Sequence, residues 1–253
     1  MSKLLRIIPR FDIKNNNLIK GVNLEGLRVI GDPCEFAKKY YLEGADEMVF
    51  MDAVASLYDR NHLSEITKKI SHNIFIPITV GGGIRSLDDA IIVLRGGADK
   101  IAINTAAIKN PELINQLSAY FGSQTIVLSI EAKKTNSGFE AYIDNGREKT
   151  GVNVKDWIIN AQKRGCGEIL LTSVDFEGTQ MGIDEDLLKY IDGIVEVPLL
   201  YSGGFGDLSD INTLYKYNFV DGLVIANNLH YKKINIHDVK EYSLNVGYLM
   251  RNE

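Results

Sequence analysis

Residues 78–83 read ITVGGG and residues 199–204 read LLYSGG, so an apolar run followed by a glycine-rich turn occurs twice, about 120 positions apart. The same offset relates three further pairs of segments, namely 11–14 with 130–133, 46–51 with 167–172, and 99–104 with 221–226. Self-similarity at a constant long spacing indicates a duplicated architecture. The sequence therefore predicts two similar halves, each with one carboxylate and one glycine-rich turn that follow apolar runs.

Short apolar runs rich in isoleucine, valine and leucine alternate with amphipathic segments along the chain. Runs that are apolar throughout are typical of parallel strands, which are buried on both faces. The predicted strands are 5–11, 47–51, 75–80, 100–103, 125–130, 168–172, 197–201 and 222–225, and the predicted helices are 33–42, 63–71, 87–95, 111–120, 154–164, 185–191, 208–217 and 236–244. This alternation predicts an α/β fold, a (β/α)8 TIM barrel with a two-fold half-barrel repeat. An open doubly wound sheet is the alternative, and the even repetition of the halves argues against it.

Length and composition fit one such barrel. The chain has 253 residues, 45% of them hydrophobic, which suits a single barrel domain over residues 1–253 with a large core. The net charge of −5 offers no general attraction to nucleic acid or to an acidic membrane, and no run of about 18 apolar residues could span one. Cys34 and Cys166 are far apart and in no metal-binding spacing. We therefore expect a soluble, cytoplasmic protein with reduced cysteines, no metal and no cofactor.

Two connections are longer than a barrel requires. One covers residues 14–32, after the first predicted strand, and we expect it to be a mobile lid that carries Lys20. The other covers residues 133–153, after the fifth predicted strand, and is typical of a small hairpin with its turn near residues 136–138. Both connections follow strands, so they lie on the face where barrels place their active sites.

Two carboxylates end opposite strands of the predicted barrel. Asp12 ends the first strand and Glu131 ends the fifth, so they face each other across the mouth. A carboxylate that directly follows a buried strand is costly unless it is paired or functional. A salt bridge explains either residue alone, but the symmetric pair favours chemistry. Two carboxylates on opposite sides of a substrate can act as general base and general acid when their surroundings give them different pKa values.

The two glycine-rich turns predict phosphate sites. Each leads from a strand into a helix, where backbone N–H groups can approach a phosphate closely. A single glycine-rich turn is weak evidence for a ligand site, because most such turns only reverse the chain. These two turns occupy equivalent positions in the two halves, which makes the evidence stronger. Each is joined by the end of the next strand, at Asn104 and Thr105 in the first half and at Ala226 and Asn227 in the second. One site in each half predicts a ligand with a phosphate at each end.

Four charged residues stand at the starts of predicted strands, on the opposite face of the barrel: Arg6, Glu47, Lys100 and Glu168. Ordinary surface ion pairs would explain such charges. All four can instead point inward as a ring of alternating sign. Such a ring would plug or gate the barrel floor.

Longer motifs connect these residues to a known family. They are RIIP (6–9) with Asp12, GADE (44–47), TVGGGIR (79–85), GADK (97–100), INTAA (103–107), KNPEL (109–113), FGSQ (121–124) and ILLTS (169–173). In these motifs the chain resembles, from end to end, the cyclase subunit of imidazole glycerol phosphate synthase, the HisF family. The match is too long and too specific to arise by chance.

The resemblance implies a lyase-type cyclase that takes ammonia from a HisH-type glutaminase subunit in a heterodimer. The partner would dock on the barrel floor, and ammonia would pass through the core. It would attack an open-chain bisphosphate, N′-(phosphoribulosyl)formimino-AICAR ribonucleotide, giving imidazole glycerol phosphate and AICAR in histidine biosynthesis. Asp12 matches a catalytic aspartate, the four floor residues match an ammonia gate, and Asp99 matches a residue facing the glutaminase. The implied substrate and phosphate contacts are Lys20, Gly83, Asn104, Thr105, Thr172, Glu177, Gly178, Gly204, Ala226 and Asn227.

Departures from the family pattern cluster at the mouth. Glu131 replaces a second catalytic aspartate, which moves the carboxylate by about 1 Å. Glu177 replaces the aspartate of an Asp-Gly-Thr motif, Arg10 stands where a cysteine is common, and residues 226–228 replace Ala-Ala-Ser. An intact gate beside an altered mouth leaves an alternative open, a paralogous ammonia-channelling subunit for acetamidino-sugar synthesis in bacterial surface polysaccharide. A related half-barrel sugar isomerase is a third hypothesis, but such an isomerase needs no gate.

Overall fold

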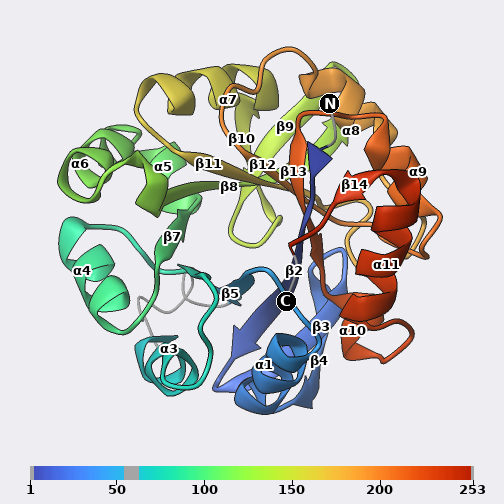
Figure 1. The fold of residues 1–253 in the computed structure, drawn as a ribbon. Coiled ribbons are helices and arrows are strands. Elements are labelled where there is room, and N and C mark those ends of the chain that lie inside the picture. Colours follow the sequence, from blue (N-terminus) through green and yellow to red (C-terminus); the bar gives the residue numbers. More distant parts are fainter. Residues whose placement is uncertain (1–2, 54–62, 252–253) are drawn as a thin grey trace.

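Eight parallel strands close into a barrel in the computed structural model, which describes residues 3–53 and 63–251 (Figure 1). The barrel strands are β2 (Arg6–Lys14), β5 (Met48–Asp52), β6 (Ile78–Gly81), β7 (Lys100–Ile103), β8 (Ile126–Thr135), β11 (Glu168–Ser173), β12 (Leu199–Ser202) and β13 (Val220–Ile225). Each strand pairs with the next, and β13 pairs with β2, placing Val224 opposite Ile8. The last strand therefore meets the first, which confirms the predicted TIM barrel over the open sheet.

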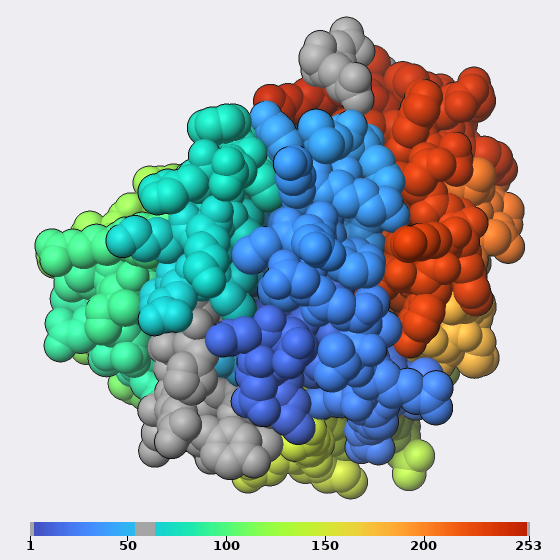
Figure 2. Space-filling model, turned by 90° about the horizontal axis from the view of Figure 1, so that it is seen from below, coloured from blue at the N-terminus to red at the C-terminus, as the bar shows by residue number. Residues whose placement is uncertain are grey.

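Helices cover the outside of the barrel (Figure 1). They are α1 (Pro33–Leu42), α3 (Leu63–Ser71), α4 (Leu87–Arg95), α5 (Thr105–Lys109), α6 (Glu112–Phe121), α7 (Val154–Lys163), α8 (Glu185–Ile191), α9 (Asp210–Tyr215), α10 (Asn227–His230) and α11 (Ile236–Val246). Figure 2 shows the side of the molecule where the barrel closes. The blue N-terminal part lies there between the red C-terminal part and the cyan segments, which follow the blue part in the sequence. Among the described residues, no helix is both long enough and apolar enough to cross a membrane.

The structure corrects the predicted helices in two ways. Helix α9 is shorter than the predicted range 208–217, because residues 207–209 form a turn in which Asp207 accepts a hydrogen bond from the Ser209 N–H at 2.7 Å. Two short helices, α5 and α10, were not predicted, since each is too short to show an amphipathic period. They begin at Thr105 and Asn227, which are equivalent positions of the two halves.

The two long connections form antiparallel strands. Residues 17–31 fold as β3 (Asn17–Val22) and β4 (Glu25–Gly31), and β3 pairs with the end of β2, placing Ile19 opposite Asp12. After β8 the chain turns back into β9 (Gly138–Ile143), which places Tyr142 opposite Glu131, and then β10 (Glu148–Asn153) follows. The hairpin turn predicted near residues 136–138 is confirmed. The predicted lid segment is a hairpin that extends the barrel sheet.

Alternation along β2 assigns its residues to layers inside the barrel. Side chains two positions apart share a face, so Arg6, Ile8, Arg10 and Asp12 all point inward, from the floor to the mouth. Ile8 belongs to an inner apolar cluster with Val49, Ala102, Val127, Leu170, Leu200 and Val224. An apolar layer therefore separates the charged floor from the charged mouth.

The two-fold repeat is visible in single hydrogen bonds at the floor. Asp99 Oδ2 accepts from the Ile78 N–H at 2.8 Å, and Asp221 Oδ2 accepts from the Leu199 N–H at 2.9 Å. These two hydrogen bonds are equivalent, because Asp99 corresponds to Asp221 and Ile78 to Leu199 at the offset seen in the sequence. In each half, an aspartate near the start of one strand therefore holds the start of the neighbouring strand.

Candidate active site

The barrel floor carries a closed ring of four ion pairs. Arg6 Nη1 donates to Glu47 Oε1 and Glu168 Oε1, both at 2.7 Å. Lys100 Nζ donates to the second oxygen of each carboxylate, at 3.0 Å for Glu47 and 2.9 Å for Glu168. The two anions are buried, and the two cations are partly exposed. The predicted ring is confirmed as geometry, and its role as a gate remains a prediction.

Asp12 lies at the mouth in a strongly cationic setting. Arg10 Nε donates to its Oδ1 at 2.9 Å, and Lys20 Nζ reaches its Oδ2 at 3.5 Å. Burial by itself would raise the pKa of this carboxyl, but the charges of Arg10 and Lys20 outweigh burial and lower it. Asp12 is therefore ionised at neutral pH and suited to accept a proton.

Glu131 lies in a different setting on the opposite strand. Its Oε2 accepts hydrogen bonds from Asn104 Nδ2 at 3.0 Å and from the Gly146 N–H at 2.8 Å, and both donors are neutral. Burial raises the pKa of Glu131 to about 7, although the Gly146 hydrogen bond and the charge of Arg10 oppose this shift. This carboxyl therefore keeps its proton to a much higher pH than an ordinary glutamate does. The two carboxylates differ in the way that general base and general acid require.

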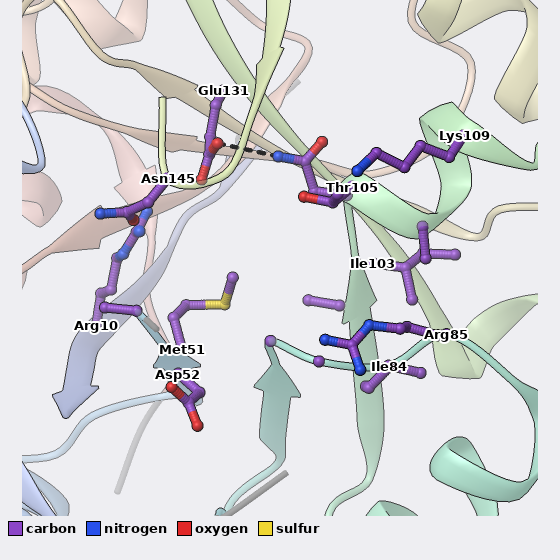
Figure 3. Close-up of a pocket in the computed structure, with 16 residues that line it drawn as sticks. Arg10, Met51, Asp52, Ile84, Arg85, Ile103, Thr105, Lys109, Glu131 and Asn145 are labelled. Carbon is purple, nitrogen blue, oxygen red and sulfur yellow. Dashed lines mark hydrogen bonds between the residues drawn. The ribbon is translucent and has the colours of Figure 1, made fainter. Parts of the chain in front are cut away.

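A cavity of about 390 Å³ extends from Glu131 across the first half of the mouth. Figure 3 shows Arg10, Glu131 and Asn145 on one side of it and Arg85 and Lys109 on the other. The predicted phosphate contacts Gly83, Asn104 and Thr105 all line this cavity. The turn after β9 fixes the side chain of Thr105, because the Asp144 N–H donates a hydrogen bond to Thr105 Oγ1 at 3.3 Å. The end of this cavity that carries Arg85, Lys109 and the glycine-rich turn offers cations and backbone N–H groups, which suit a phosphate group.

The remaining predicted contacts gather in the second half of the mouth. Two adjoining cavities share Gly178 and Asn227. Lys20 lines one of them, and Glu177, Gly204 and Ala226 line the other. A Cβ on Gly204 would lie 1.9 Å from the Gly182 oxygen, so only glycine fits there at its φ of +84°. The structure thus assembles both predicted anion regions, one in each half.

The β3–β4 hairpin is held down over the mouth. The Asn23 N–H donates to the Glu177 backbone oxygen at 2.7 Å, and Asn145 Nδ2 donates to the Leu24 oxygen at 3.1 Å. Lys20 is buried beneath the hairpin, paired with Glu177 and with Asp12. In this arrangement Lys20 belongs to the ion-pair network at the centre of the mouth.

Several site residues were missed or underrated from the sequence. Arg85 and Lys109 line the first cavity, although both stand inside the quoted motifs, and Asn145 lies in a turn that carries no local signal. Thr172 is expected to contact substrate, and that expectation stays a prediction; in the structure its Oγ1 accepts a hydrogen bond from Arg10 at 3.0 Å. The basic residue next to the first glycine-rich turn, Arg85, could have been predicted as a phosphate contact. The Arg10–Thr172 contact could not be predicted, because it joins residues 162 positions apart.

The fold defines a class, the (β/α)8 barrels built from two related halves. A family model described as "Histidine biosynthesis protein" matches residues 6–235. The chain is 60% identical over 209 residues to the imidazole glycerol phosphate synthase subunit HisF of Legionella pneumophila, which covers 82% of this chain and 99% of that protein. The HisF subunit of Natranaerobius thermophilus is 43% identical over 246 residues, covering 97% of this chain and 98% of that protein.

A third relative, the HisF subunit of Lactococcus lactis subsp. cremoris, is 45% identical over 238 residues and covers 93% of this chain and 92% of that protein. The chain belongs to the HisF family of enzymes, the cyclase subunits of imidazole glycerol phosphate synthase in histidine biosynthesis. The word "subunit" in the names of these relatives implies a complex with a partner subunit.

Proposed function

We propose that this protein uses ammonia to convert N′-(phosphoribulosyl)formimino-AICAR ribonucleotide into imidazole glycerol phosphate and AICAR. One observation carries the proposal. Asp12 and Glu131 stand on opposite sides of the mouth, and the pKa of Asp12 is lowered whereas that of Glu131 is raised to about 7. The two anion regions flank these carboxylates, as a substrate with a phosphate at each end requires.

The two carboxyls have complementary tasks in this reaction. Ammonia must lose protons as its nitrogen bonds to carbon, and ionised Asp12 is suited to accept one. The groups that leave must gain a proton, and protonated Glu131 is suited to supply it. Asn104 connects phosphate binding with the acid, because it lines the first anion cavity and also donates to Glu131. Binding of the phosphate end would thereby set the position of the acid.

We further propose that the ammonia comes from a HisH-type glutaminase that forms a heterodimer with this chain and docks on the floor. The ring of Arg6, Glu47, Lys100 and Glu168 would be the gate, and exposed Asp99 would face the partner. Above the ring, the inner apolar layer would favour neutral ammonia over ions. We place the complex in the cytoplasm, and the two free cysteines, Cys34 and Cys166, support a reducing compartment.

The alternative function, ammonia supply for acetamidino-sugar synthesis, is not favoured. The matching family model and the relatives described above carry histidine-biosynthesis names. The mouth also keeps a carboxylate at both catalytic positions, and each has an environment suited to its task. A subunit that only conducted ammonia would need neither.

The test is turnover of the bisphosphate with an ammonium salt and no glutaminase. We expect AICAR and imidazole glycerol phosphate to form in equal amounts, measured by chromatography. Asp12→Asn should abolish this turnover while its circular dichroism spectrum matches that of the wild type. Wild-type protein that binds the bisphosphate but releases no AICAR would refute the cyclase proposal.

A further inference from the structure

Arg10 is a buried cation at the centre of the mouth. Its side chain is 2% exposed, and its Nε and Nη1 donate to Asp12 Oδ1 at 2.9 Å and Thr172 Oγ1 at 3.0 Å. A guanidinium carries five N–H donors, so donors remain beyond these two contacts. Arg10 also lines the first cavity, where an oxygen of a bound molecule could accept from them.

The backbone of Arg10 is held from outside the barrel. His230 Nε2 lies 2.9 Å from the Arg10 carbonyl oxygen, and Tyr40 Oη lies 2.9 Å from His230 Nδ1. Burial lowers the pKa of His230 to about 4, so this imidazole is neutral and donates from Nε2 to the carbonyl. Both the main chain and the guanidinium of Arg10 are thus fixed. A pre-organised donor of this kind is what stabilises developing charge without reorganisation.

Arg10 stands between the two anion regions. It lines the first cavity beside Glu131 and Asn145 (Figure 3), while its partner Asp12 contacts Lys20, which lines the second. The first cavity shares no lining residue with the other two. The ion pairs from Arg10 to Asp12 and from Asp12 to Lys20 therefore connect the first cavity with the second. On the inner face of β2, Arg10 is also the next side chain above Ile8 and the apolar layer, where ammonia would emerge.

We propose that Arg10 binds the carbonyl oxygen of the open-chain sugar in the substrate and stabilises the negative charge that forms on it when ammonia adds. In this step the nitrogen lone pair forms the C–N bond, and the electron pair of the C=O π bond moves onto oxygen. Arg10 holds that oxygen until a proton from Glu131 neutralises it, and Asp12 takes the proton that nitrogen loses. This inference rests on the proposed cyclase function.

Arg10 also bears on the charges of both carboxyls. The groups that face it are Asp12 from its own strand, Lys20 from β3, Glu131 from β8, Glu177 from the segment after β11 and His230 from α10. Its charge lowers the pKa of Asp12 and that of Glu131. Removing the charge should therefore raise both pKa values. Both limbs of the pH profile of kcat should then move to higher pH.

The experiment compares Arg10→Met, which removes charge and donors, with Arg10→Lys, which keeps the charge but loses the planar fork. We expect Arg10→Met to lower kcat for ammonia-dependent turnover by about 100-fold or more, the usual loss for a donor to a developing oxyanion. Both limbs of the pH profile of kcat should move to higher pH in this variant. In Arg10→Lys, kcat should fall about 10-fold while both limbs keep their wild-type pH values, because the charge remains. The matched control is Arg95→Met on exposed α4, which should change nothing.

A shift of the limbs reports only the charge of Arg10 near the two carboxyls, whereas the size of the loss in kcat reports the contact with the oxyanion. A purely structural role would lower the melting temperature and leave kcat of the folded Arg10→Met protein within about 10-fold of wild type, and that result would overturn the proposal. If the wild type shows no turnover, the cyclase function fails and the Arg10 proposal is judged by calorimetric binding of the bisphosphate. Binding at least about 10-fold weaker in Arg10→Met than in wild type would then support the contact. Equal binding would refute it.

Discussion

Asn104 Nδ2 donates to Glu131 Oε2 at 3.0 Å, so one amide links the first anion cavity to the carboxyl with the raised pKa (Figure 3). The same Nδ2 also donates to the Tyr142 carbonyl at 3.1 Å, which fixes the amide against β9. In the proposed function, one side chain directly after β7 would therefore link phosphate binding to acid catalysis.

Glu131 should govern the alkaline limb of activity. Because burial raises its pKa to about 7, the carboxyl is protonated below that pH and loses its proton above it. We expect kcat, measured at a constant concentration of unprotonated ammonia, to fall as pH rises through about 7. Glu131→Gln should lower kcat by about 100-fold or more, since the amide cannot deliver a proton. Glu131→Asp, which keeps a titratable group, is the matched control, and a Gln variant as active as wild type would exclude the acid role.

The same carboxyl should make stability depend on pH. The folded protein binds the Glu131 proton more tightly than the unfolded chain does, so this contribution is complete below the unfolded pKa of about 4.3. It is lost as pH rises to the folded value of about 7. Against wild type, Glu131→Gln should gain up to about 3 kcal/mol in unfolding free energy between pH 4 and pH 8.

Urea unfolding at several pH values measures this gain, with Glu241→Gln on the exposed face of α11 as the control. A difference between Glu131→Gln and wild type that stays constant over the whole range would show that the carboxyl is not held protonated by the fold. The control variant should track wild type at every pH, because its side chain is in water in both states.

Lys100 should separate the two activities of the complex. Its Nζ bridges Glu47 and Glu168, so Lys100→Ala leaves these two buried carboxylates with only Arg6 between them. The two like charges then share one bridging cation instead of two, so they repel each other more strongly and the opened ring admits water. We expect glutamine-dependent turnover with the cognate glutaminase to fall at least about 10-fold while ammonia-dependent turnover stays within about 2-fold. The control is Lys216→Ala, which removes an exposed lysine that lies 3.8 Å from Glu185. If Lys100→Ala lowers both activities equally, the ring is a structural salt-bridge cluster and not a gate.

Two anions should bind, one in each half of the mouth. Crystals grown with phosphate should show density at Gly83 and Thr105 and again at Gly178 and Gly204, where backbone N–H groups are available. Thr105→Val should weaken only the first site and Gly204→Ala only the second, as measured by calorimetric titration with inorganic phosphate. A second half that stays empty at saturating phosphate would contradict a bisphosphate substrate.

The sequence alone determined the barrel, the alternation of its strands and helices, and the four charges of the floor ring. Strand and helix periods are local, so a few neighbouring residues suffice to show them. Helices α1, α3, α4 and α8 accordingly have the predicted bounds. The floor ring could be predicted for the same reason, because four charges at strand starts on a common face must meet at the axis of a closed barrel.

Only the tertiary structure decided the chemistry of the mouth. The raised pKa of Glu131 depends on burial beneath β9 and the turn at Gly146, and the lowered pKa of Asp12 depends on Arg10 and Lys20. The burial of Lys20 depends on a hairpin that the sequence presented as a lid. These properties arise from the exclusion of water and from contacts between residues far apart in the chain, and no local pattern encodes either one.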